Sequence, residues 1–368
     1  MNYQELKEKL NLENIKYAEN YELAPMTTLK IGGPARLYIE LNDIPSAQKT
    51  IKLVSESGLP VFFLGGGSNL LIADEGFDGI VIKNKIEGIS ILNDSGNSND
   101  LKVDNVEQQE KEEQKKLEAR LMQVETDKYL SFDALNYDES DKEHIYVKVY
   151  SGTLLSYTID QLIKNGITGL QWFAGIPGTI GGAVFNNIHG GTYYLSQYLA
   201  EIEIIDNNGD IKVLKVNDLD LDYDYSKLQE SKSFILSAKL KLYKGDKEKA
   251  KDTAIKWAQS KVRVQPYNSA GSSFKNITKE EALKNNFLSN GWGYIIEKEL
   301  DLKGFKYNGA QISTKHAAFV ENLGSAKAED VLYLFDLIYD KAKEKYNLTP
   351  KSEIFFLGFP LERIKKFL

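Results

Sequence analysis

Two glycine-rich stretches carry the residues best suited to binding chemistry. The first, Gln171-Trp-Phe-Ala-Gly-Ile-Pro-Gly-Thr-Ile-Gly-Gly-Ala-Val-Phe-Asn-Asn, holds four glycines, a proline and two adjacent amides among apolar residues. Glycine permits a positive φ and a close approach to the backbone, and exposed N–H groups favour phosphate and other anions. On its own, the stretch fits either a phosphate-binding loop or a tight turn between packed elements.

The second stretch, Gly65-Gly-Gly-Ser-Asn, follows the apolar run 61–64 and precedes Leu70-Leu-Ile-Ala. A strand, a glycine-rich turn and an amide side chain in this order can hold a phosphate. The spacing is neither the G-x-G-x-x-G of a Rossmann unit nor a Walker A motif, since no Gly-Lys-Ser/Thr follows. A sharp β-turn is the alternative interpretation.

Residues typical of metal and nucleophile chemistry are scarce. The chain has no cysteine, which excludes disulfides, thiolate metal sites and cysteine nucleophiles. Its three histidines, His144, His189 and His316, are far apart in the sequence. We therefore expect no metal site.

Hydrophobic periodicity predicts the elements that must position these loops. Helices are expected within 2–18 and over 43–57, 154–165, 247–261 and 328–346. Strands are expected over 35–40, 61–64, 79–83, 89–92, 145–150, 233–242 and 352–357, with a hairpin of strands 200–205 and 211–214 joined by an Asn-Gly turn. Residues 93–142 are polar and charged, which predicts a surface insertion, part helix and part mobile loop, with partner binding as the alternative.

Length and charge narrow the class of protein. A chain of 368 residues with 42% hydrophobic residues suits two or three domains. A net charge of −7 argues against a nucleic-acid-binding surface. Neither a signal peptide nor an apolar run of about 18 residues is present, so we expect a cytoplasmic protein with no nucleic acid and no membrane partner.

Five loops, taken in order, resemble those of one enzyme family. The UDP-N-acetylenolpyruvoylglucosamine reductases (UDP-N-acetylmuramate dehydrogenases) of peptidoglycan synthesis have similar motifs, and a glutamate like Glu353 before the last strand. The resemblance covers nearly the whole chain except about 93–142, and the short spacing from Ser226 to Gln265-Pro266 is similar to the type that lacks an extra substrate-covering loop. The matching motifs are Thr27-Thr-Leu-Lys-Ile-Gly-Gly-Pro-Ala, Leu64-Gly-Gly-Gly-Ser-Asn-Leu-Leu, Ala174-Gly-Ile-Pro-Gly-Thr-Ile-Gly-Gly-Ala-Val, Ser269-Ala-Gly-Ser-Ser-Phe-Lys-Asn and Lys315-His-Ala-Ala-Phe-Val-Glu-Asn.

This resemblance implies an α+β protein with an FAD-binding fold of the vanillyl-alcohol-oxidase/PCMH type, made of two α+β subdomains that hold FAD between them. A C-terminal α+β domain would bind the UDP-sugar. The expected domains are residues 1–82, 83–245 including the insertion, and 246–368, with the last strand free to return to the first subdomain. A monomer is expected.

The resemblance also implies the chemistry. NADPH reduces FAD and leaves, and the enolpyruvyl UDP-sugar then takes the same site. Hydride passes from flavin N5 to C3 of the enolpyruvyl group, and a proton passes to C2. Ser272 matches the proton donor and Glu353 the glutamate that polarises the enol. Tyr223, Lys275, Asn276, Lys315 and His316 match or adjoin substrate-binding positions. The expected cofactor-binding residues are Thr28, Ile31, Gly32, Gly65, Gly66, Gly67, Ser68, Asn69, Gly152, Ala174, Gly175, Ile176, Pro177, Gly178, Thr179, Gly181, Gly182, Ala183 and Asn187.

Two positions depart from the family pattern. Asp224 stands where the family's Tyr-Arg-x-Ser motif has an arginine that binds the substrate carboxylate, so Lys227, Arg263 or Lys315 would have to supply the cation. His189 lies in a shortened continuation of the first glycine loop, where it either hydrogen-bonds FAD or packs. The departures leave two alternatives open: a different oxidoreductase on the same fold, or a flavin-binding relative with impaired catalysis.

Overall fold

The computed structural model describes residues 1–92, 98–101, 137–231 and 233–368. Most of the predicted insertion, residues 93–97 and 102–136, lies outside this range. The described chain forms two compact units. The first unit comprises Met1–Tyr17, Ile39–Gly66 and Ile82–Val262, and the second comprises Ala18–Tyr38, Gly67–Val81 and Arg263–Leu368. The three domains expected from the sequence, residues 1–82, 83–245 and 246–368, stay a prediction.

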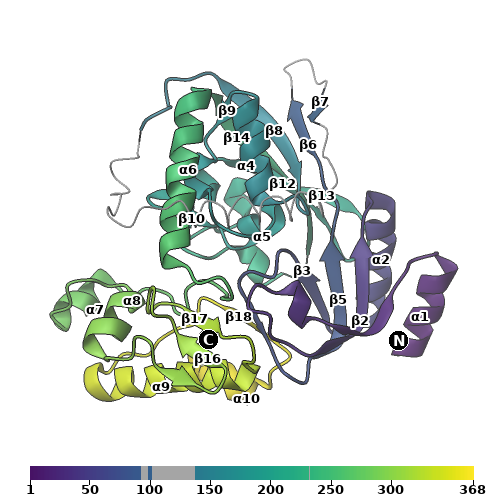
Figure 1. Ribbon diagram of the computed structural model, residues 1–368. Helices are drawn as coiled ribbons and strands as arrows, with labels where there is room; N and C mark the ends of the chain where they lie inside the picture. The colour runs from purple at the N-terminus through teal and green to yellow at the C-terminus, as the bar shows by residue number, and fades with distance from the viewer. Residues whose placement is uncertain (93–97, 102–136, 232) are drawn as a thin grey trace. The chain divides into compact units, whose positions relative to one another are not determined.

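An antiparallel seven-stranded sheet is the centre of the first unit (Figure 1). Its strand order is β13-β12-β14-β8-β6-β7, with β9 paired to one end of β14. Helix α5 packs on β14 and β8. The strands are β6 (Ile89–Leu92), β7 (Ser98–Leu101), β8 (His144–Tyr150), β9 (Ile167–Thr168), β12 (Leu199–Ile205), β13 (Ile211–Lys215) and β14 (Phe234–Lys244); the helices are α4 (Leu155–Lys164), α5 (Ile180–Phe185) and α6 (Lys247–Val264).

The predicted hairpin is confirmed as β12 and β13. Asp206 Oδ1 accepts hydrogen bonds from the backbone N–H groups of Asn208 and Asp210, and Gly209 has a φ of 84°. Glycine adopts this conformation without strain, and a Cβ atom there would lie 2.6 Å from the Gln48 carbonyl oxygen. The core of this unit includes the fully buried Trp172, Phe173 and Trp257, so the first glycine-rich stretch begins inside the core.

Helices α1 (Tyr3–Leu12) and α2 (Ile44–Ser57) also belong to the first unit and pack on each other. Helix α2 has the predicted bounds because Asp43 caps its first turn and Gly58 ends it with a φ of 68°. Helix α1 ends well before residue 18, since Asn14 has a φ of 57° and a strand begins at Ala18.

A further sheet has the order β1-β2-β5-β3, with β1 (Ala18–Glu22), β2 (Pro34–Leu41), β3 (Val61–Leu64) and β5 (Phe77–Asn84).

The second unit has a three-stranded antiparallel sheet, β15-β16-β17, against which α9 packs. Strand β18, near the end of the chain, pairs in parallel with β4 from the N-terminal part. The core includes Phe274, Trp292, Phe335 and Phe367. The elements are β4 (Leu70–Ile72), β15 (Lys306–Tyr307), β16 (Ala310–Ile312), β17 (Val320–Asn322), β18 (Phe355–Leu357), α7 (Lys279–Lys284), α8 (Trp292–Tyr294), a π-helical turn (Ile295–Glu299), α9 (Ala328–Tyr346) and α10 (Leu361–Ile364).

Strand β18 is shorter than the predicted 352–357. Ser352 Oγ accepts a hydrogen bond from the Ile354 N–H at 3.0 Å, and the Glu353 N–H donates to the carbonyl of Ser273 at 3.1 Å. These residues therefore form a turn before the strand begins. Among the described helices, none combines the length and apolar character that a transmembrane span requires.

Candidate functional site

The two glycine-rich loops meet inside the first unit. A Cβ atom on Gly66 would lie 2.5 Å from Gly178 Cα, and one on Gly65 would lie 3.0 Å from Thr179 Oγ1. A separation of 2.5 Å between such atoms is far inside van der Waals contact. Backbone therefore lies directly against backbone here, and only glycine permits it.

The turn between β8 and α4 fixes the backbone of residues 178–181 through hydrogen bonds. The N–H groups of Gly181 and Ile180 donate to the carbonyls of Ser151 and Thr153 at 2.8 and 2.9 Å. Ser151 is itself held, because Asn84 donates to its hydroxyl and that hydroxyl donates to the Ile235 carbonyl, each at 2.5 Å. Gly152 packs on the backbone as well, and a Cβ atom there would lie 2.7 Å from the Ile86 carbonyl oxygen. The structure thus brings the predicted residues 65–66, 152 and 178–181 together, whereas Gly175 packs on α6, where a Cβ atom would lie 2.9 Å from Ala258 Cα.

Gly67 and the Thr27–Thr28 loop meet in the second unit. The Thr28 N–H donates to the Gly67 carbonyl at 3.1 Å, and a Cβ atom on Gly67 would lie 2.1 Å from the Met26 carbonyl oxygen. Thr28 Oγ1 donates to the Ser269 carbonyl at 2.6 Å. Gly32, with a φ of 137°, packs against Ile72 in the same unit, and Ile31 is buried. The threonine therefore joins this loop to the segment that leads to Ser272.

Ser272 and Glu353 lie on neighbouring segments of the second unit. Gly271, with a φ of 86°, turns the chain ahead of the half-buried Ser272. The next residue, Ser273, accepts a hydrogen bond from the Glu353 N–H, while Asn69 Nδ2 donates to the Glu353 carbonyl at 3.0 Å. One side chain from the second glycine loop therefore fixes the backbone of the predicted catalytic glutamate.

Lys275, Asn276 and His316 surround residues 291–293. Trp292 Nε1 donates to the Lys275 carbonyl at 2.9 Å, and a Cβ atom on Gly291 would lie 3.6 Å from Asn276 Oδ1. A Cβ atom on Gly293 would lie 2.2 Å from His316 Cε1, so the imidazole packs directly on the glycine backbone. The predicted Lys315 is exposed next to it.

His316 is set up as a neutral hydrogen-bond donor. Burial, with the Lys303 ammonium as a smaller cause and opposed by Glu297, lowers the pKa of His316 below its usual value. Its Nδ1 accepts a hydrogen bond from the Ala318 N–H at 3.2 Å. The proton of the neutral ring is therefore on Nε2.

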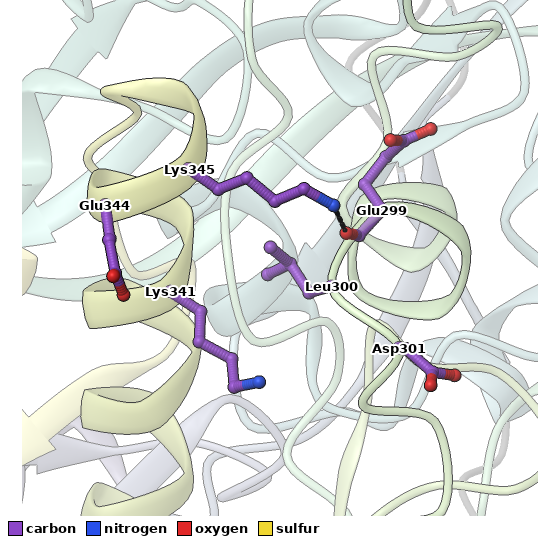
Figure 2. Close-up of a pocket in the computed structure, with 6 residues that line it drawn as sticks. All are labelled: Glu299, Leu300, Asp301, Lys341, Glu344 and Lys345. Carbon is purple, nitrogen blue, oxygen red and sulfur yellow. Dashed lines mark hydrogen bonds between the residues drawn. The ribbon is translucent and has the colours of Figure 1, made fainter.

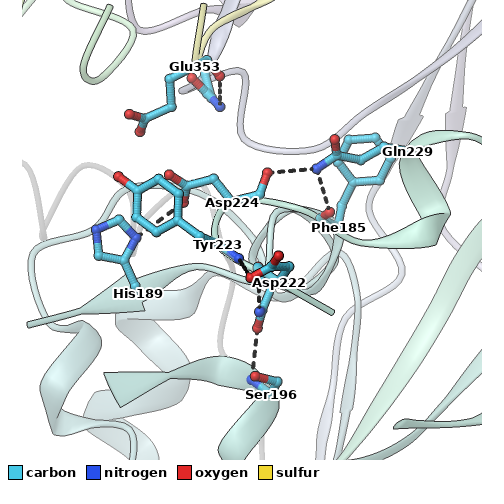
Figure 3. A network of polar contacts seen from close by, with 10 residues as sticks. Phe185, His189, Ser196, Asp222, Tyr223, Asp224, Gln229 and Glu353 are labelled. Atoms are coloured by element: carbon cyan, nitrogen blue, oxygen red, sulfur yellow. Dashed lines mark hydrogen bonds and ion pairs between the residues drawn. The ribbon is translucent and has the colours of Figure 1, made fainter. Parts of the chain in front are cut away.

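The two departures from the family pattern meet in the first unit, where His189 Nδ1 lies 3.2 Å from Asp224 Oδ1 (Figure 3). The Tyr223 ring centroid lies 5.1 Å from that of the imidazole. Of the cations considered as replacements for the family arginine, Lys227 instead pairs with Asp220 at 3.5 Å. Sequence reasoning identified both residues but missed the pair, because nothing in a single sequence links positions 35 residues apart.

A tight turn and several hydrogen bonds hold Asp224 in place. The Tyr225 N–H donates to the Asp222 carbonyl at 3.2 Å, and Asp224 has a φ of 48°, a conformation that aspartate tolerates better than most residues. Figure 3 shows Gln229 Nε2 donating to the carbonyls of both Asp224 and Phe185, at 3.1 and 3.3 Å. The amide of Asn187, two residues after the end of α5, donates to the Asp222 carbonyl at 2.9 Å.

A surface hollow of about 490 Å³ in the second unit contains none of the predicted site residues. Two lysines and three acids line it around Leu300, and Lys345 Nζ donates to the Glu299 carbonyl at 2.7 Å (Figure 2). Opposite charges are mixed in its wall, which favours no ligand of one sign. The described residues contain no group of three or more His, Asp or Glu side chains placed to hold a metal ion.

The glycine loops of the first unit fit the phosphates of FAD. No side chain separates Gly66 from Gly178, so a phosphate at this edge would meet backbone and the small side chain of Thr179. Residues 65–66 and 174–182 would hold the cofactor there. FAD would supply hydride chemistry, which none of the protein's own side chains can perform.

Comparison with known proteins matches residues 264–357 to the C-terminal domain of UDP-N-acetylenolpyruvoylglucosamine reductase and residues 122–215 to an FAD binding domain. UDP-N-acetylenolpyruvoylglucosamine reductase from Acaryochloris marina is 31% identical over 344 residues, 92% of each chain. The chain belongs to the UDP-N-acetylenolpyruvoylglucosamine reductase family. The family's enzyme from Chlamydia felis is 32% identical over 92% of this chain and 94% of its own. The crystal structure of the Thermus caldophilus reductase has a TM-score of 0.64 at 24% identity, covering 93% of this chain and 98% of that one.

Membership of the reductase family confirms several predictions. The fold is the α+β FAD-binding fold of the vanillyl-alcohol-oxidase/PCMH type with the family's C-terminal domain. The protein is an enzyme of the UDP-N-acetylmuramate dehydrogenase family of peptidoglycan precursor synthesis, and the predicted cofactors, FAD and NADPH, are those of the family. The loop subtype, the monomeric state and the roles of individual site residues stay predictions.

Proposed function

We propose that the chain reduces UDP-N-acetylglucosamine enolpyruvate to UDP-N-acetylmuramate in the cytoplasm, using FAD and NADPH. Residues 65–66 and 174–182 would hold FAD, which would supply the hydride chemistry between NADPH and C3 of the enolpyruvyl group. The protein's own residues bind and orient the UDP-sugar, stabilise the negative charge that develops toward C2 and the carboxylate, and add the proton at C2.

Ser272 is the proton donor to C2 in this proposal, and Glu353 assists by polarising the enol. A serine hydroxyl is a weak acid on its own, so its neighbours must tune it. The observation that carries the assignment is the hydrogen bond from the Glu353 N–H to the Ser273 carbonyl, which holds the two segments side by side. Tyr223, Lys275, Asn276, Lys315 and His316 would contact the UDP-sugar.

The proposal is tested by separating the two half-reactions of the purified flavoprotein. NADPH should bleach the flavin absorbance, and UDP-N-acetylglucosamine enolpyruvate should restore it anaerobically. Ser272→Ala should keep the first rate and slow the second by about 100-fold or more, since general acid catalysis contributes about 10²–10⁴-fold. Ser269→Ala is the matched control, because its hydroxyl is buried and donates to the Pro266 carbonyl.

Three outcomes would overturn parts of this proposal. Absence of flavin would exclude FAD chemistry. Flavin reduction with no reoxidation by the enolpyruvyl sugar in the unaltered protein would point to a different substrate or to impaired catalysis. Equal reoxidation rates for the unaltered protein and Ser272→Ala would remove Ser272 as the proton donor.

A further inference from the structure

The pair of His189 and Asp224 lies on a frame that fixes both residues. Asn187 is only 2% exposed, and its side chain donates to the Asp222 carbonyl and accepts from the Ser196 N–H, each at 2.9 Å. These bonds tie the chain directly after the first glycine loop to the turn that carries Asp224. The imidazole therefore stands at the exit of the loop that we assign to FAD, within one unit.

The contact with Asp224 decides which side of the imidazole is available to a ligand. An aspartate oxygen accepts, so the proton in the 3.2 Å contact belongs to Nδ1, and Nε2 lies on the opposite side of the ring. The His189 side chain is 32% exposed, whereas that of Asp224 is 12% exposed. Within the described part of the chain, Asp224 Oδ2 is buried without a hydrogen-bond partner. Because Oδ2 of this buried carboxylate has no hydrogen-bond partner, a positive charge on the partner of Oδ1 stabilises the carboxylate most.

We propose that His189 binds an anionic oxygen of a ligand through Nε2, and that Asp224 is the positioning residue for its ring. This inference rests on the proposed function, which supplies two ligand groups with anionic oxygens. They are the pyrophosphate of FAD and the carboxylate of the enolpyruvyl group. With the anion at Nε2 and Asp224 at Nδ1, the ring carries a proton on each nitrogen and donates to both. The Tyr223 and Tyr194 rings, with centroids 5.1 and 6.0 Å from that of the imidazole, flank it.

The alternative is that the pair only pins the turn at residues 222–225 to the glycine loop. The two roles use different nitrogen atoms, since pinning needs Nδ1 and ligand binding needs Nε2. Substitutions that mimic one nitrogen at a time therefore separate them.

The experiment compares His189→Asn with His189→Gln. The asparagine amide replaces Nδ1 and keeps the contact with Asp224, whereas the longer glutamine amide replaces Nε2 and keeps a donor for the ligand. Two dissociation constants are measured for each variant. One is for FAD, by fluorescence titration of the apoprotein; the other is for UDP-N-acetylglucosamine enolpyruvate, from the change in the oxidised flavin spectrum without NADPH.

We expect His189→Asn to raise one of the two constants about tenfold or more, the loss typical of a hydrogen bond to a charged group, and His189→Gln to raise it less than threefold. The constant that rises identifies whether the oxygen belongs to FAD or to the substrate. Unchanged constants in His189→Asn, or a larger loss in His189→Gln, would overturn the proposal. Wild-type protein that binds FAD but no enolpyruvyl sugar would instead refute the proposed function, and the FAD measurement would still test His189.

Asp224→Asn tests the positioning role, since asparagine also tolerates a positive φ. If the carboxylate acts through His189, this variant weakens binding of the same anion severalfold, and adding it to His189→Asn causes no further loss. Tighter anion binding in Asp224→Asn, as simple relief of charge repulsion would give, would contradict the proposal. Additive losses in the double variant would contradict it as well.

Discussion

Replacing Gly66 by alanine tests whether the close approach of the two glycine loops is what holds FAD. The new Cβ would lie 2.5 Å from Gly178 Cα and 3.3 Å from Gly178 C, whereas ordinary contact begins at 3.4 Å. The loops would have to separate by about 0.9 Å, and both contacts are with backbone that no rotamer change can move. Overpacking of this kind costs about 1–3 kcal/mol.

If that cost falls on the loop arrangement that binds FAD, Gly66→Ala raises the dissociation constant for FAD by about 5-fold to 150-fold. Gly291→Ala is the matched control, because Gly291 lies outside the glycine loops assigned to FAD. Its Cβ would meet only the Ser289 and Asn276 side chains, at 3.5 and 3.6 Å, and its φ of −81° suits alanine. The assay is titration of apoprotein with FAD, followed by flavin fluorescence, with thermal unfolding of each variant alongside.

Equal FAD affinity in Gly66→Ala and the unaltered protein would refute the reasoning, because the loops could then separate without loss of the cofactor. A loss in Gly291→Ala as large as that in Gly66→Ala would refute it too, since it would show that the clash at Gly178 is not the cause.

Two further predictions concern buried groups. Because burial lowers the pKa of His316, the unfolded chain binds a proton near pH 6.5 before the folded chain does, so the free energy of unfolding falls as the pH drops below about 6.5. His316→Gln should flatten this dependence in unfolding midpoints between pH 5 and 8, and an unchanged slope would contradict it. Glu139 is 7% exposed and accepts hydrogen bonds from Thr168 and Gln171 at 2.6 and 2.9 Å. Glu139→Ala should lower the free energy of unfolding in urea by about 2–4 kcal/mol, since the buried Thr168 hydroxyl loses its acceptor and the Gln171 amide keeps only the Tyr137 hydroxyl. A change as small as that from replacing the exposed Glu143 would contradict it.

Local structure could be predicted from the sequence where one short-range cause decides it. Helix α2 has its predicted bounds because Asp43 and Gly58 mark its ends, and the β12–β13 hairpin has its predicted turn because Gly209 supplies a positive φ. The start of β18 was predicted less well. Ser352 forms a turn with Ile354 through a side-chain hydrogen bond that periodicity does not reveal, so the strand begins only at Phe355.

Long-range contacts of the site could not be predicted from the residues alone. The glycines identified the two loops, but only the fold shows that Gly66 lies against Gly178. Glu139 lies within the polar stretch that predicted a solvated surface, yet it is buried because Thr168 and Gln171 satisfy its oxygens. The resemblance to the reductases supplied the order of the motifs, and the structure added which of their side chains touch.

The parallel pairing of β18 with β4 has a consequence for how the protein is made on the ribosome. The second unit takes residues from three separated parts of the chain, and its core joins Leu29 and Leu71 to Ile354 and Phe367. During synthesis, nearly 300 residues separate β4 from its partner strand β18. The first unit can fold first, because its last segment ends at Val262. The second unit needs Ile354 and Phe367 for its core, and these residues are synthesised much later. A ribosome that stalls before residue 355 therefore releases a chain with an unpaired β4, which is a substrate for chaperones and proteases rather than an enzyme.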